Sequence, residues 1–137
     1  MLLLRASVFL RQEKPDDALV SYRQADPFYR NLPLVLAGKG KALAMLGDYN
    51  GAALLVRKAV QQNDLTALLL QAENSLRAGN EQEGFRQLAK LLQTVPLTNL
   101  INNLHAAEKD PFQIPLNETI LRQAVLTTAE RMLPNLP

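Results

Sequence analysis

Side chains that could perform catalysis or bind a metal are few in this 137-residue sequence and stand far apart. His105 is the only histidine and cysteine is absent, so a His-paired metal site, an HExxH motif and a catalytic thiolate are excluded. A hydrolytic serine would need His105 and the sharp turn of a nucleophile elbow, and no serine has that context. The serines of the chain are Ser7, Ser21 and Ser75. We therefore expect no catalytic centre, no metal and no cofactor.

Two further patterns resemble known chemistry but have simpler explanations. Gly38-Lys39-Gly40-Lys41 lacks the GxxxxGK[ST] spacing of a phosphate-binding loop, and no strand precedes it. Neighbouring carboxylates occur at Asp16-Asp17, at Glu81 and Glu83, and at Glu108 and Asp110. They stand at expected helix N-termini or in connections, where they would cap helices and offset the helix dipole. The chain is predicted not to be an enzyme.

The composition is typical of a helical protein without a marked preference for charged partners. Hydrophobic residues make up 47% and aromatic residues 5%, and Leu and Ala dominate over β-branched residues. The net charge is +2, acidic residues are interleaved with basic ones, and the longest basic run is Arg57-Lys58. Nucleic-acid binding would need basic residues gathered on one face with aromatic residues between them. We expect no nucleic-acid partner.

No segment of the sequence predicts a membrane span, which needs roughly 20 consecutive apolar residues. Residues 1–4 are apolar, but Arg5 and the charged stretch 11–17 interrupt them before the hydrophobic region of a signal peptide could form. We expect these residues to begin a helix and the protein to be cytoplasmic, without membrane insertion. A periplasmic location is the alternative if a targeting segment has been lost upstream.

Residues 34–64 organise the chain and are predicted to form two short amphipathic helices joined by a tight turn. The first helix is expected to end at Gly47, which supplies the backbone freedom for the turn. Asp48 then offers its side chain to the free amide groups that open the second helix. Small residues, among them Gly40 and Ala52, would let the two helix axes approach closely.

The same order of small and bulky residues recurs on both sides of this stretch, at a nearly constant offset. In the preceding copy, Gly40, Leu43, Ala52, Val56 and Ala59 correspond to Ala6, Phe9, Ala18, Tyr22 and Ala25. In the following copy, whose offset is slightly shorter, Gly40, Gly47, Ala52, Val56 and Ala59 correspond to Ala72, Gly79, Gly84, Leu88 and Leu91. The small residues predicted to pack the helices are Ala6, Ala18, Ala25, Gly40, Gly47, Ala52, Ala59, Ala72, Gly79 and Gly84.

These repeats resemble the tetratricopeptide repeat (TPR) family, whose unit is a helix–turn–helix of about 34 residues. The middle unit carries the resemblance through Gly40, Leu43, Gly47-Asp48-Tyr49, Ala52, Val56 and Ala59. The first unit has Glu13 in place of the turn glycine, and no Trp stands near the start of any unit. The resemblance covers residues 1–96. It implies an all-α fold, an α-solenoid of three TPR-like units at about 1–32, 33–64 and 65–96.

Residues 97–133 do not repeat and are expected to form a C-terminal pair of capping helices, within a single domain spanning 1–137. Prolines keep residues 110–115 from being helical, and Asn117 is expected to cap the last helix. An apolar stripe on that helix supports an alternative function, a structural subunit that self-assembles as a homodimer. The stripe consists of Ile120, Leu121, Ala124, Val125 and Thr128.

Local signals predict the other helix boundaries. Asp26-Pro27 is expected to end the second helix, and the following Phe28 and Tyr29 to fold back over the joint between the first two units. Asp64 is expected to cap the fifth helix. Asn80 opens a capping-box pattern at the start of the sixth.

In the tetratricopeptide family the first helix of each unit lines a concave groove that binds a partner, so the resemblance implies such a groove here. The positions carried over are Leu3, Ser7, Leu10, Leu34, Ala37, Lys41, Ala44, Thr66, Leu69, Glu73 and Leu76. This mostly apolar lining suits an apolar helix or an extended segment of a partner protein. Coverage of the groove by residues 97–133 or by a second copy is the alternative.

The expected function is therefore that of a non-enzymatic protein-interaction module, an adaptor, scaffold or co-chaperone that binds a protein or peptide segment. One specific version of this expectation is a bacterial secretion chaperone, because the repeat number and the apolar groove are similar in plan to that class. A related version is an assembly factor for pili or another envelope machine.

Overall fold

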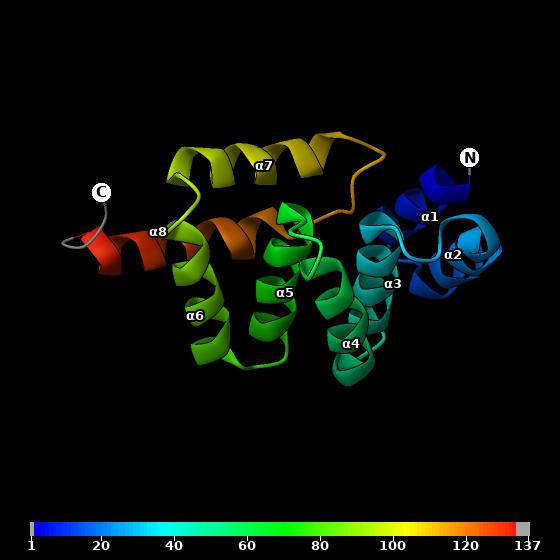
Figure 1. Ribbon diagram of the computed structural model, residues 1–137, viewed down its shortest axis with the longest axis horizontal. Helices are drawn as coiled ribbons and strands as arrows, with labels where there is room; N and C mark the ends of the chain where they lie inside the picture. The colour runs from blue at the N-terminus through cyan, green and yellow to red at the C-terminus, as the bar shows by residue number, and fades with distance from the viewer. Residues whose placement is uncertain (1, 134–137) are drawn as a thin grey trace.

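Residues 2–133 are described by a computed structural model, in which they form eight α-helices joined by short connections (Figure 1). The helices are α1 (Leu2–Arg11), α2 (Pro15–Tyr29), α3 (Pro33–Met45), α4 (Tyr49–Val60), α5 (Leu65–Arg77), α6 (Glu81–Leu92), α7 (Leu97–Lys109) and α8 (Glu118–Met132). The described residues contain no strand, so the all-α prediction is confirmed. None of these helices is long and apolar enough to cross a membrane.

The first six helices pack as three consecutive pairs in a solenoid-like arrangement. Helix α1 packs on α2, α3 on α4 and α5 on α6, and each pair contacts the next through α2 with α3 and α4 with α5. The first helices of the pairs also contact one another, α1 with α3 and α3 with α5. The predicted series of three helix–turn–helix units is thus confirmed.

The same backbone turn joins the two helices of every pair. Glu13, Gly47 and Gly79 occupy equivalent positions in the three units and adopt positive φ angles of 58°, 87° and 83°. In each turn the next N–H donates to a carbonyl five residues earlier: Lys14 to Phe9, Asp48 to Leu43 and Asn80 to Ser75. This is the Schellman arrangement that ends a helix with a left-handed residue. Glu13 adopts it despite having a side chain.

Small residues let the helices of a pair approach closely. A Cβ atom built on Gly40 would lie 2.4 Å from Cγ2 of Val56 in α4. One built on Gly84 would lie 2.8 Å from Cδ2 of Leu76 in α5. The alanines at the other packing positions are fully buried: Ala6, Ala18, Ala25, Ala52, Ala59 and Ala72. Any larger side chain at these positions would push two helices apart.

Three of the four predicted side-chain caps are present. Asp48, Asp64 and Asn117 each accept a hydrogen bond from the backbone N–H three residues later. The prediction for Asn80 is wrong, because its side chain forms no capping hydrogen bond. Glu81 and Glu83 lie in the first turn of α6. Their negative charges interact favourably with the dipole at the start of the helix, in the absence of a side-chain cap.

Helix α2 continues through Pro27 to Tyr29, so the prediction that Asp26-Pro27 ends it is wrong. Pro27 removes one backbone donor, but only the last turn follows it, and the N–H of Arg30 still donates to the carbonyl of Asp26. Lys39 of α3 also contacts the Asp26 carboxylate, at 2.5 and 2.6 Å. The longer helix leaves Phe28 and Tyr29 exposed. The prediction that they cover the joint between units is wrong as well.

Helices α7 and α8 close the C-terminal end of the array. Helix α8 packs on α6 and α5, and α7 packs on α8. Helix α7 returns along the array towards the N-terminal helices, and the connection after it, residues 110–117, turns back there before α8 begins (Figure 1). This return brings residues from opposite ends of the sequence into contact, and it determines what happens to the predicted groove.

Candidate functional site

The predicted groove residues lie on α1, α3 and α5 and have little access to solvent. Seven are buried, namely Ser7, Leu10, Ala37, Lys41, Ala44, Leu69 and Glu73. Four are partly buried, namely Leu3, Leu34, Thr66 and Leu76. We call the surface formed by these three helices the inner face. It is covered rather than open.

Residues 110–117 lie against the inner face at α1 and α5, and polar side chains hold this segment mainly by its backbone. The guanidinium of Arg11 donates to the carbonyl oxygens of Ala107, Glu108, Asp110 and Gln113. The hydroxyl of Ser7 donates to the carbonyl of Pro111. Ile114 is fully buried and Leu116 is 7% exposed, so both side chains belong to the core. The segment is thus held against α1 and α5 by hydrogen bonds and by two buried apolar side chains.

A buried ion pair ties the inner face to the start of α8. Lys41 Nζ lies 2.7 Å from Oε2 of Glu73, and the other oxygen of Glu73 accepts the backbone N–H of Asn117. Arg77 Nε is 3.8 Å from the same carboxylate. Burial lowers the pKa of Lys41, and the negative charge of Glu73 partly opposes that shift. The prediction places both charges towards a partner, but in the structure they contact groups of the same chain.

The stripe proposed as a dimerisation seam is also internal. Ile120 is 38% exposed, and the other four residues of the stripe are buried: Leu121, Ala124, Val125 and Thr128. They lie on α8, which packs on α5 and α6 of the same chain. A second copy could reach this stripe only after α8 had separated from α5 and α6.

An open cleft lies between α4 and α6, with α5 as its floor, and we call it the α4–α6 cleft. Its volume is about 890 Å³. Apolar residues at its base include Val56, Val60, Leu68 and Leu91, and most of the remaining lining is polar. None of the eleven predicted groove residues lines it. The cleft is therefore a different site from the groove that the repeats imply.

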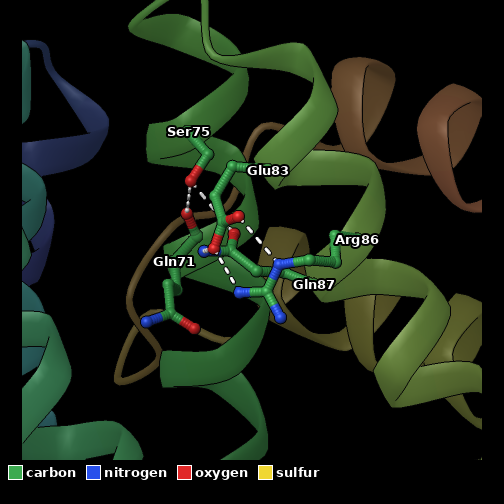
Figure 2. Close-up of polar contacts among 5 residues, drawn as sticks. All are labelled: Gln71, Ser75, Glu83, Arg86 and Gln87. Atoms are coloured by element: carbon green, nitrogen blue, oxygen red, sulfur yellow. Dashed lines mark hydrogen bonds and ion pairs between the residues drawn. The ribbon is translucent and has the colours of Figure 1, made fainter.

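A hydrogen-bond network joins α5 and α6 inside this cleft (Figure 2). The hydroxyl oxygen of Ser75 lies 3.1 Å from the backbone carbonyl of Gln71 and 3.0 Å from Oε1 of Gln87, and its single hydrogen is shared between these two acceptors. Gln87 in turn donates to Glu83, and Arg86 Nε donates to the same carboxylate at 2.8 Å. Hydrogen bonding to Arg86 lowers the pKa of Glu83, so this carboxylate stays ionised.

Two kinds of polar group in the cleft lack partners among residues 2–133. Arg57 on α4 and Lys90 on α6 form no ion pair with any described residue. Asn74 on α5 is 9% exposed, and both polar atoms of its side-chain amide are buried without a hydrogen-bond partner. Orphaned buried amides are uncommon and costly. A ligand that formed ion pairs or hydrogen bonds with these groups would gain the most binding free energy.

Polar residues at helical spacing were the sequence signal for this cleft. Gln71, Asn74 and Ser75 recur at three and four residues on α5, and Glu83, Arg86, Gln87 and Lys90 do so on α6. A stripe of this kind usually indicates a solvated helix face. The two stripes form a site only because α5 and α6 pack with these faces adjoining, which the sequence does not reveal.

His105 lies near two carboxylates where α7 meets α8. One donor atom each from His105, Glu108 and Glu118 lie within 4.8 Å of one another. A hydrogen bond with Glu118 and the negative charge of that residue raise the pKa of Glu108. Arg122 Nη1 also lies 3.6 Å from Glu118. The guanidinium of Arg122 therefore supplies positive charge to this group without a metal. His105 and Glu108 are exposed and Glu118 is partly buried, so the group is a surface contact between the two helices.

Comparison of the chain with protein-family models, with curated proteins and with solved structures gives no match.

Proposed function

We propose that the protein is a non-enzymatic protein-interaction module that binds a non-helical segment of polypeptide on its inner face. One observation carries the proposal, namely that residues 110–117 of the chain itself lie on this face. The first and third units contact the segment through Ser7 and Glu73, and Lys41 of the middle unit pairs with Glu73. Ser7, Lys41 and Glu73 are equivalent residues of successive units. A partner segment would take the place of the internal one.

The contacts on the inner face suit recognition of a peptide backbone. Arg11 and Ser7 donate to carbonyl oxygens, which every peptide presents, and Glu73 accepts an N–H group. Selectivity would come from the two buried side chains, Ile114 and Leu116, which stand two residues apart. This combination of backbone contacts and alternate apolar anchors is a common mode of peptide recognition.

Exchange with an external partner is limited by the internal segment. A tethered segment competes at an effective concentration on the order of millimolar, so an external peptide with the same contacts would bind weakly to the intact chain. We propose that the natural partner adds contacts outside the segment. The tetratricopeptide-like arrangement, with a role as adaptor, scaffold or co-chaperone, is part of this proposal.

The test supplies the segment as a separate molecule. Residues 110–116 are replaced by a Gly-Ser linker of equal length, and a fluorescein-labelled peptide with the sequence of residues 108–118 is titrated against this variant. We expect saturable binding by anisotropy. The matched control peptide carries aspartate at the positions of Ile114 and Leu116 and should not bind.

A milder variant keeps the test informative if the linker variant does not fold. Ile114→Ala with Leu116→Ala keeps the chain length and weakens only the two apolar anchors. The proposed function is overturned if the linker variant retains its helical circular dichroism and does not bind the peptide, or if the alanine variant binds it no better than the unchanged chain.

A further inference from the structure

We propose that the α4–α6 cleft is a second binding site, which takes an extended peptide segment bearing carboxylates. The proposal does not depend on the inner face, because none of the residues that hold residues 110–117 lines the cleft. The occupant is a segment of a partner protein with acidic side chains.

Charge is the first argument for an acidic segment. The charged side chains lining the cleft are Arg57, Arg86 and Lys90, with Glu83 as the one carboxylate. Glu83 is already paired with Arg86, at an Nε–Oε2 distance of 2.8 Å. Arg57 and Lys90, from opposite walls, have no ionic partner among the described residues. Carboxylates placed between these walls would pair with them.

Hydrogen-bonding capacity is the argument for a peptide. A side-chain amide offers donors and acceptors together, which match the C=O and N–H groups of an extended backbone. Asn74 has both kinds of atom buried and unpaired at the cleft lining. Rotation of the Asn74 side chain towards a bound backbone amide would pair atoms that carry an energetic cost in the free protein.

The rest of the lining disfavours nucleic acid. Single-stranded nucleic acids bind by stacking bases on aromatic side chains along a basic groove. Tyr49 is the one aromatic residue in the cleft, and the Glu83 carboxylate would repel phosphates. The apolar base formed by Val56, Val60 and Leu68 instead suits aliphatic side chains next to the carboxylates.

The experiment selects the ligand from random sequences. A phage-displayed library of random ten-residue peptides is selected on the full chain, and enriched peptides are synthesised and titrated by fluorescence anisotropy. We expect enrichment of Asp and Glu beside aliphatic residues. The charge-reversed variant Arg57→Glu with Lys90→Glu should bind these peptides about tenfold more weakly or worse.

Two further variants distinguish a loss of binding in the cleft from an effect of net charge and from an effect on folding. Arg5→Glu with Arg23→Glu makes the same change in net charge on exposed positions outside the cleft and should leave affinity unchanged. Asn74→Leu removes the amide at similar volume, so it should weaken peptide binding while raising the melting temperature.

Several outcomes would overturn the proposal. These are selected peptides without acidic residues, peptides whose affinity survives Arg57→Glu with Lys90→Glu, and equal losses in the Arg5 and Arg23 control. Binding of fluorescent oligothymidylate that depends on the cleft, or dimers by light scattering that the same reversal dissolves, would assign the cleft to nucleic acid or to a second copy. Because the probe differs from the 108–118 peptide, failure here leaves the inner-face result unaffected.

Discussion

Lys41 of α3 and Glu73 of α5 form a buried ion pair, with Nζ 2.7 Å from Oε2, and the same carboxylate accepts the N–H of Asn117. Three elements distant in the sequence therefore meet at one carboxylate. The side chain of Glu73 is fully buried and that of Lys41 is 6% exposed. A buried pair of this kind contributes little net stability, but either charge alone would be costly.

Neutralising one member of the pair should destabilise the fold more than neutralising both. Glu73→Gln leaves the Lys41 ammonium without a counter-charge and should lower the free energy of unfolding by about 3–5 kcal/mol. Lys41→Met with Glu73→Gln removes both charges and keeps an acceptor for Asn117, so most of that loss should be recovered. Urea denaturation of Lys41→Met, Glu73→Gln and the double variant gives the coupling free energy between the two residues. Additive losses would contradict this account.

Arg11 should control how firmly residues 110–117 are held. Arg11→Lys keeps the charge but cannot reach four carbonyl oxygens, because an ammonium lacks the planar fork of a guanidinium. We expect a loss of about 1–3 kcal/mol in local stability. Hydrogen exchange should then become faster in residues 107–117 and stay unchanged in α4. The control Arg5→Lys, on the exposed side of α1, should alter neither region.

The fold could be predicted from sequence because its signals are local. Gly47 marks the turn of the middle unit, and the offset between the first two units places Glu13 at the same turn. Asp48 and Asp64 stand immediately before helices and cap them. Pro27 misled the prediction because a proline near the end of a helix costs one hydrogen bond, which nearby contacts can offset.

The site could not be predicted because it depends on contacts between distant segments. The prolines after Asp110 exclude a helix, but they do not show that the segment returns to Arg11. Lys41 and Glu73 were assigned to an open groove, yet they occupy equivalent positions in successive units. Equivalent positions on adjacent helices are neighbours, so opposite charges there could have been interpreted as a pair.

Gly38 should be intolerant of even one extra methyl group. A Cβ atom at Gly38 would lie 2.0 Å from Oη and 2.2 Å from Cζ of Tyr22, whose ring is fully buried. Alanine gains about 1 kcal/mol in helix propensity, but overpacking a core costs about 1–3 kcal/mol and displaces a rigid ring here. Gly38→Ala should therefore be destabilising in urea denaturation. Combining it with Tyr22→Leu should cost less than the sum of the two single changes.

Glu13→Gly should stabilise the protein. Glu13 holds a φ angle of 58°, which costs a residue with a side chain about 1–2 kcal/mol, and the side chain is exposed. Glycine adopts this conformation freely, so a gain of about 1 kcal/mol in the free energy of unfolding is expected. Gly47→Ala, at the equivalent turn, should show a loss of similar size. No gain from Glu13→Gly would mean that its carboxylate makes a compensating interaction.

Glu108→Gln should change the pH dependence of stability at the contact between α7 and α8. The hydrogen bond with Glu118 and its negative charge raise the pKa of Glu108 above its ordinary value of 4.5, so the folded state binds this proton more tightly than the unfolded state. The resulting stabilisation is fully present below pH 4.5 and is lost as the pH rises through the folded-state pKa. Glutamine keeps a donor for Glu118 at every pH.

The melting temperature of Glu108→Gln should therefore exceed that of the wild type at pH 7, and the difference should shrink as the pH falls towards 4.5. Thermal denaturation followed by circular dichroism at half-unit intervals measures both curves. Glu130→Gln, an exposed change on the same helix as Glu118, controls for the loss of one negative charge. A difference that is independent of pH, or the same trend in Glu130→Gln, would show that the Glu108–Glu118 contact does not titrate as described.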